Sequence, residues 1–182
     1  MVGTVAGQEI MAVGWFPMKA ATRPNVRRRA LGSDDRISIR TREHLVASRL
    51  NPYINFADNA REAMEFYKTV FGGTLTINTY GEYGAPDAPE ADKIMHGQLE
   101  TDKGFTLMGA DNPPGSEHNP GNNMTVSLSG EDAGELRGYW EKLSNGGTVS
   151  VPLEKQMWGD EFGMLVDQFG IPWLVNITVP RT

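Results

Sequence analysis

His96 and Glu100 are the side chains in this chain whose types and positions best suit acid–base chemistry. They lie in the segment 94–100, where Met95 and Leu99 occupy one side of an alternating pattern and His96 and Glu100 occupy the other. An imidazole that titrates near neutrality can exchange protons with a substrate, and a carboxylate can assist it. Both residues are therefore predicted to be catalytic. The alternative is that His96 is a hydrogen-bonded residue in the wall of a hollow.

Few other side chains are available for metal or covalent chemistry. The chain has no cysteine, which excludes disulfides, thiol nucleophiles and thiolate metal sites. His44 lies in an Arg-rich N-terminal segment and His118 in a stretch rich in proline and glycine, so we expect both to be solvated. His96 and Glu100 alone would hold a metal ion weakly.

Aromatic, amide and thioether side chains predict a small-molecule site around His96. Pockets with apolar walls and a few convergent polar groups are typical of such sites. Alternation along 50–56 and 123–128 places polar side chains on the same open side as His96. The predicted ligand-binding residues are Tyr53, Asn55, Met108, Asn123 and Trp158.

Trp158 has two possible roles. It lies beside Gly159 and close to Met157 and Phe162, a composition that suits an aromatic lid over a planar or apolar ligand. A plug in the hydrophobic core is the alternative.

The elements that must position these residues follow one plan that occurs twice. Helical apolar patterns in 60–71 and 131–143 are each followed by Gly-Gly-Thr, and the closing residues Thr74 and Thr148 are 74 positions apart. Self-similarity at a fixed period indicates a structural unit used twice, because one copy cannot bury its apolar side alone. The predicted strands are 50–56, 74–80, 94–100 and 105–109 in the first copy, and 123–128, 148–153, 162–167 and 171–178 in the second.

This order predicts an α+β fold of two β-α-β-β-β modules. Module 1 spans about 49–110 and module 2 about 122–180, within a domain of residues 49–182. Each module has one helix, which covers one face of its sheet. The two uncovered faces are predicted to form a cup.

The charge distribution separates an N-terminal segment from this domain. Residues 1–49 hold nine basic and four acidic residues, whereas residues 50–182 hold eight basic and nineteen acidic residues. We predict that residues 1–48 are a disordered basic extension, the alternatives being a nucleic-acid arm or a transit peptide. The acidic domain argues against nucleic acid as its partner. No run of about 18 apolar residues occurs, so no membrane span is predicted, and the lack of cysteine favours the cytoplasm.

Both modules contain distinctive local motifs, which are NPYINF (51–56), AREAMEFY (60–67), FGG (71–73), MHGQL (95–99), WGD (158–160), FG (162–163) and DQFGIPW (167–173). These motifs resemble the PhnB-like branch of the vicinal oxygen chelate superfamily, which includes glyoxalases, bleomycin-resistance proteins and extradiol dioxygenases. Some proteins of this branch carry a demethylubiquinone methyltransferase-like domain label. The resemblance covers about residues 50–180.

The resemblance also implies a metal site that this sequence does not match. Enzymes of the superfamily hold a divalent ion with His and Glu on the first and last strands of each module. The corresponding segments, 51–56, 105–109, 123–128 and 172–177, contain no His, Asp or Glu. We therefore predict neither a metal nor another cofactor. The resemblance further implies a homodimer, and leaves open whether modules pair within one chain or between two.

Three functions are compatible with these observations. The first is a binding protein for a small organic molecule without the usual metal centre. The alternative is a glyoxalase- or dioxygenase-like enzyme with a displaced metal or an acid–base site around His96 and Glu100. A methyltransferase is the third, but its methyl donor generally requires a Gly-rich turn after a parallel strand, and residues 108–111 contain a single glycine.

Overall fold

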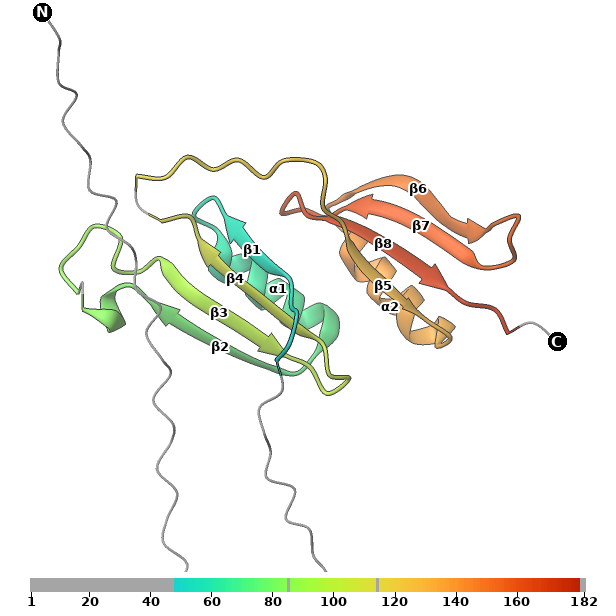
Figure 1. The fold of residues 1–182 in the computed structure, drawn as a ribbon, viewed down its shortest axis with the longest axis horizontal. Helices are drawn as coiled ribbons and strands as arrows, with labels where there is room; N and C mark the ends of the chain where they lie inside the picture. Colours follow the sequence, from blue (N-terminus) through green and yellow to red (C-terminus); the bar gives the residue numbers. More distant parts are fainter. Residues whose placement is uncertain (1–47, 85, 114, 181–182) are drawn as a thin grey trace, which may run out of the picture. The chain divides into compact units, whose positions relative to one another are not determined.

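The structure is a computed structural model that describes residues 48–84, 86–113 and 115–180. The predicted N-terminal extension, residues 1–48, lies outside the described residues except for its last position. The described part forms two modules with the same order of elements (Figure 1). Its two α-helices have 12 residues each, and no helix in this part is long and apolar enough to cross a membrane.

The first module is built on a helix with one apolar side. α1 (Ala60–Phe71) buries Ala63, Met64, Tyr67 and Val70, which recur at three- and four-residue spacing. The strands of its sheet, named sheet A, have the order β1 (Tyr53–Phe56), β4 (Thr106–Asp111), β3 (Ile94–Glu100) and β2 (Thr74–Thr79), and a short 3-10 helix, η1 (Gly81–Tyr83), follows β2. β1 is parallel to β4, and the other neighbours are antiparallel.

The second module repeats this arrangement. α2 (Ala133–Ser144) buries Leu136, Tyr139 and Leu143. The strands of sheet B have the order β5 (Val126–Gly130), β8 (Pro172–Ile177), β7 (Glu161–Val166) and β6 (Thr148–Lys155), with β5 parallel to β8 and the other pairs antiparallel. The predicted α+β class with two β-α-β-β-β modules is confirmed.

The repeated Gly-Gly-Thr has the same structural cause in both modules. A Cβ atom at Gly73 would lie 2.2 Å from the carbonyl oxygen of Glu100, and one at Gly147 would lie 2.5 Å from that of Val166. These oxygens are at the ends of β3 and β7, the equivalent strands of the two sheets. Only glycine allows the chain that leaves each helix to approach the neighbouring strand so closely.

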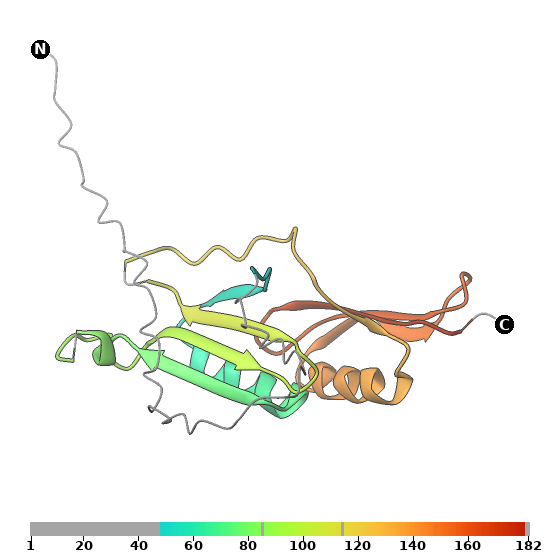
Figure 2. The same ribbon diagram turned by 60° about the horizontal axis from the view of Figure 1, so that its bottom comes forward.

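Each helix covers one face of its own sheet (Figure 2). In sheet A, a Cβ atom at Gly97 would lie 3.4 Å from Cγ of Met64 on α1, and Leu99 is fully buried. In sheet B, Leu165 and Val175 are buried in the same way. The opposite face of each sheet carries no helix in the described part of the chain, and we name it the open face.

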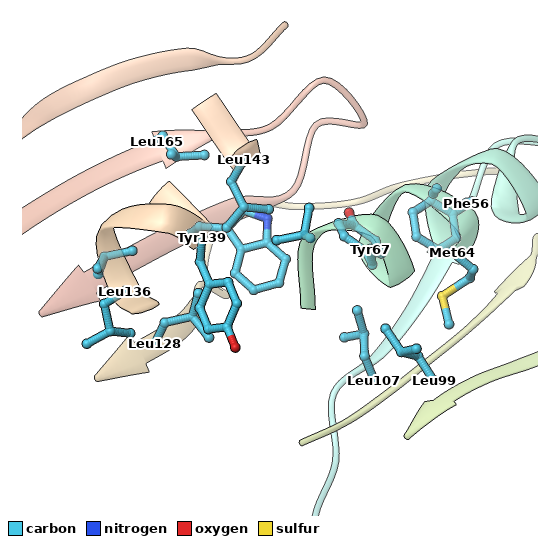
Figure 3. Packing of buried hydrophobic residues seen from close by; sticks show 14 of the residues in the cluster. Phe56, Met64, Tyr67, Leu99, Leu107, Leu128, Leu136, Tyr139, Leu143 and Leu165 are labelled. Carbon is cyan, nitrogen blue, oxygen red and sulfur yellow. The ribbon is translucent and has the colours of Figure 1, made fainter. Parts of the chain in front are cut away.

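The two modules share one hydrophobic core at the point where their helices meet (Figure 3). The rings of Phe71 on α1 and Tyr139 on α2 are 5.0 Å apart, and those of Tyr67 and Trp173 are 5.7 Å apart. The helices therefore touch each other, while each also covers its own sheet. If the two open faces packed against each other, α1 and α2 would lie on opposite outer sides of the pair of sheets. Since the two helices are in contact, the two open faces do not pack against each other within one chain.

Buried carboxylates fix the modules at two places. Asp167 accepts hydrogen bonds of 2.8 Å from the hydroxyl of Tyr67 and from Nε1 of Trp173, so it joins α1 to β8. Asp111, at the end of β4, accepts hydrogen bonds from the backbone N–H groups of Ala60 (2.8 Å) and Ile94 (2.7 Å). Asp111 thereby satisfies a free N–H group at the start of α1, where the N-cap residue makes no side-chain bond.

Candidate functional site

The open face of sheet A is predominantly polar. Residues directly opposite each other in a ladder lie on the same face of a sheet, so the pairing registers identify its members. We name this surface the polar face. Its residues are Tyr53, Asn55, Thr74, Thr76, Asn78, His96, Gln98, Glu100, Thr106, Met108 and Ala110.

Tyr53 and His96 form the centre of the polar face. The Tyr53 hydroxyl lies 3.3 Å from Nδ1 of His96, and the two rings stack with centroids 5.8 Å apart. Met108 is the direct ladder partner of Tyr53, and Asn55 follows on the same side of β1. Four of the residues predicted from the sequence are thus brought together on one surface.

The environment of Tyr53 keeps its hydroxyl protonated. Partial burial, and to a smaller extent the neighbouring Tyr80, raise the pKa of Tyr53 above its ordinary value. A phenol that keeps its proton can both donate and accept a hydrogen bond. Tyr53 can therefore orient the imidazole of His96 or bind a ligand directly.

The structure does not bring His96 and Glu100 together. They are four residues apart on β3, and at the rise of an extended strand this separates their Cα atoms by about 13 Å. Glu100 is the last residue of the strand, where its carboxylate lies 4.0 Å from Arg49. The two predicted catalytic residues therefore do not form a pair, and His96 contacts Tyr53 instead.

Asn123 lies away from the other predicted residues. The strand predicted to begin there begins at Val126, so Asn123 is an exposed residue in the bend that precedes β5. Gly121, Asn122 and Asn123 all favour turns, which explains why the chain becomes extended later than predicted.

Trp158 lies at the tip of the hairpin between β6 and β7. Its ring meets that of Phe162 edge-on at 5.9 Å, and its residue surface is 48% exposed. Gly159 follows with φ of 104°, a backbone conformation that glycine adopts readily. This position is incompatible with a plug in the core and agrees with an aromatic residue at the edge of an open face.

The open face of sheet B has an apolar centre, which the sequence analysis did not identify. Phe162 and Met164 on β7 and Leu174 on β8 are partly buried side chains at its centre. We name this surface the apolar face. Its residues are Ser127, Ser129, Thr148, Val151, Glu154, Phe162, Met164, Val166, Pro172, Leu174 and Asn176.

The metal site implied by the resemblance does not fit the side chains present. Among the described residues of β1, β4, β5 and β8, Asp111 is the one His, Asp or Glu. Its carboxylate oxygens accept the N–H groups of Ala60 and Ile94 inside the protein. No three His, Cys, Asp or Glu residues in the described part lie close enough to share one metal ion.

Two cavities lie away from the contact between Tyr53 and His96. One, of about 380 Å³, is at the junction of the modules. It is lined by apolar residues that include Pro52, Phe105, Leu128 and Trp173, and by Thr106 of the polar face and Ser127 and Ser129 of the apolar face. The other, of about 250 Å³, is lined by Asp58, Lys93, Asn112 and His118, among others. Neither includes a residue predicted to bind the ligand. Tyr53, which stacks on His96, is 48% exposed, so this part of the polar face is open to solvent in one chain.

A family model matches most of the described chain. Residues 48–176 match the model described as 3-demethylubiquinone-9 3-methyltransferase. Protein YjdN of Escherichia coli is 25% identical over 140 residues, which cover 70% of this chain and 94% of that protein. An uncharacterized protein of Mycobacterium tuberculosis is 31% identical over 132 residues, which cover 68% of this chain and 71% of that protein.

Solved structures with the same fold include proteins of the wider superfamily. Protein PA1353 from Pseudomonas aeruginosa is 35% identical, with a TM-score of 0.65, over 72% of this chain and 98% of that chain. A glyoxylase/bleomycin resistance protein/dioxygenase domain from Frankia is 12% identical, with a TM-score of 0.53, over 75% of this chain and 96% of that chain. The second similarity concerns the fold alone.

Proposed function

The chain belongs to the PhnB-like 3-demethylubiquinone-9 3-methyltransferase family, within the vicinal oxygen chelate superfamily, and we propose that it binds a small organic molecule without the usual metal centre. The observation that carries this proposal is the contrast between the two open faces. The polar face presents the stacked Tyr53 and His96, and the apolar face presents Phe162 and Met164. A ligand held between them would have apolar walls and a few convergent polar groups.

A second copy of the chain completes the site in this proposal. The open faces cannot meet within one chain because α1 and α2 contact each other. In a two-fold homodimer, the polar face of one protomer can cover the apolar face of its partner, and symmetry then creates two equal sites. The partly exposed Tyr53 and Trp158, each 48% exposed, would gain cover in such a dimer.

An enzyme is the second candidate, and the contact between Tyr53 and His96 favours it. A histidine whose Nδ1 is oriented by a phenol can act as a general base through its other ring nitrogen. A displaced metal site shared by His96 and Glu100 is less favoured, because their Cα atoms are about 13 Å apart along β3 and the ligands of one ion lie about 2 Å from it.

Methyl transfer is not proposed for this chain. Gly109, the single glycine in the segment 108–111, faces the core, where a Cβ atom would lie 2.8 Å from Phe56 and 3.3 Å from the sulfur of Met64. Its role is to allow close packing between β4 and α1. It therefore does not supply a cofactor-binding turn.

Amide chemical shifts measured during titration with neutral aromatic fragments test the binding proposal. We expect shifts at β3, β7 and β8 and at the indole of Trp158. Trp158→Ala and His96→Ala should each weaken binding by about tenfold, since central interface residues typically contribute more than about 1 kcal/mol. Met124→Ala is the matched control, because Met124 is 76% exposed and lies outside both faces.

Two other results would change the proposed location of the site or the proposed function. Shifts confined to the cavity at the module junction would contradict binding at the open faces. Stoichiometric metal in the purified protein, lost in His96→Ala, would support the enzyme in place of the binding protein.

A further inference from the structure

The two open faces share a charge pattern that restricts what they can bind. None of the described strand residues that form the polar and apolar faces is Lys or Arg. Two are acidic, Glu100 on the polar face and Glu154 on the apolar face. His96 is the one other basic residue type on the two faces, and its Nδ1 lies 3.3 Å from the Tyr53 hydroxyl.

Three basic residues close to the ends of the two sheets are paired with acids. Arg49 lies 4.0 Å from Glu100, and Lys93 lies 2.9 Å from Asp58. At the hairpin end of sheet B, Nε of Arg137 donates a hydrogen bond of 3.1 Å to Glu161.

The remaining groups suit a ligand that carries neutral or positive polar groups. Asn55, Asn78 and Gln98 offer both hydrogen-bond donors and acceptors. Phe162 and Trp158 offer aromatic surfaces that can stack on a planar ring or a cation.

From this pattern we propose that the site selects planar aromatic ligands that are uncharged or cationic, and that it rejects anions such as carboxylates, phosphates and phosphonates. The inference depends on the proposed function, since it describes the ligand of the same site. An anion held between the faces would lose its hydration without gaining a Lys or Arg partner from the strands of either face. Glu154 would repel it and attract a cation, whereas the charge of Glu100 is partly offset by Arg49 at 4.0 Å.

A series of naphthalene derivatives that differ only in charge tests this selectivity. The four probes are 2-naphthylmethylamine, 2-naphthamide, 2-naphthoate and naphthalene-2-phosphonate, and their affinities for the full chain are measured by calorimetry. We expect the amine and the amide to bind, and each anion to bind at least about tenfold more weakly, as for a buried charge without a partner. Equal or tighter binding of an anion overturns the charge selectivity and leaves the proposed function intact. Failure of all four probes to bind overturns the proposed function and this inference with it.

A variant that reverses the selectivity provides an independent check. Gln98 lies in the centre of the polar face, opposite Met108 and Thr76. Gln98→Lys should strengthen 2-naphthoate binding by about tenfold or more and weaken binding of the amine, because it supplies the missing cation. Met124→Lys adds the same charge at an exposed position outside both faces and should leave the order of affinities unchanged. Similar changes in both variants would show that net charge, and not the faces, sets the selectivity.

Discussion

Asp167 is the residue that connects the two modules most directly. The residue is 4% exposed, and its carboxylate accepts four hydrogen bonds, from the side chains of Tyr67 and Trp173 and from the backbone N–H groups of Phe169 and Ile171. A buried carboxylate with four donors is fully paired, so its charge is tolerated in the interior. The motif 167–173 therefore has a structural cause, because it closes the turn before β8 and holds α1 against it.

Replacement of Asp167 should destabilise the protein strongly. In Asp167→Asn, an NH₂ group would replace one of the two accepting oxygens and would face hydrogen-bond donors. We expect a loss of about 3 kcal/mol in the free energy of unfolding, since broken buried hydrogen bonds to a charged group cost about this much. Asp160→Asn is the control, since Asp160 bonds to Asn176 in a less buried position, and it should cost under about 1 kcal/mol. Urea unfolding measures both, and equal losses would contradict the role given to Asp167.

Tyr67 should make the stability fall at high pH. Burial, followed by the adjacent Asp167 carboxylate, raises the pKa of Tyr67 well above its ordinary value. Above about pH 10 the phenol ionises in the unfolded chain but keeps its proton in the folded chain, so rising pH favours unfolding. Tyr67→Phe should reduce the slope of stability against pH by up to about 1.4 kcal/mol per pH unit above pH 10.

A residual slope should persist in that variant. Burial, with the help of Glu135, also raises the pKa of Tyr139 to about 12. Urea unfolding at several pH values between 10 and 12 gives both slopes. An unchanged slope in Tyr67→Phe would show that Tyr67 ionises equally in the folded and unfolded chains.

At the scale of the elements, close packing explains glycines that the sequence pattern does not. A Cβ atom at Gly163 on β7 would lie 2.7 Å from the ring of Trp140 and 2.9 Å from Cα of Leu153. Gly138 lies within α2 and has no atom within 4 Å of the same position. Substitution by alanine at these two glycines should therefore change the stability of the protein in opposite directions.

Gly163→Ala should destabilise the protein by about 1–3 kcal/mol, the usual cost of adding a methyl group to a packed core. Gly138→Ala should stabilise it by about 0.5–1 kcal/mol, because alanine favours a helix over glycine. Thermal and urea unfolding of the two variants measure this difference. Destabilisation by both would mean that the space around Gly138 is occupied in solution.

The spacing of apolar residues predicted the helices correctly where a second signal, the residues that end a helix, agreed with it. The Gly-Gly-Thr after each apolar helix correctly located α1 and α2, since helix spacing and helix termination agree there. Alternation correctly placed Tyr53 and His96 on one face, and a contact between them follows from the order of the strands. That order depends on pairing between distant segments, which no local pattern specifies.

Alternation was insufficient where the distance along a strand matters. It correctly placed His96 and Glu100 on one face of β3, but residues four apart on a strand have Cα atoms separated by about 13 Å. The apolar face was not predicted from the sequence because β7 and β8 carry apolar residues on both sides. Such strands are typical of a fully buried sheet. Phe162 and Met164 were recognisable as its members only once α2 was seen to cover the other side.

At the scale of the whole molecule, duplication creates two unlike surfaces from one plan. Sheet A and sheet B have the same strand order, but one open face is polar and the other apolar. The contact between α1 and α2 prevents one face from covering the other within the chain. In our proposal, a homodimer in which unlike faces meet accounts for both properties.

Cross-linking of mixed single-cysteine variants tests this pairing most directly, because the chain has no cysteine of its own. Gln98→Cys marks the polar face and Met164→Cys marks the apolar face. Packed sheets lie about 10 Å apart, so a bismaleimide that reaches about 10–15 Å can join them. We predict a covalent dimer when the two variants are mixed and little or none with either variant alone. Cross-linking that is equal in the separate variants, or absent from the mixture, would contradict a site built between the polar face of one protomer and the apolar face of its partner.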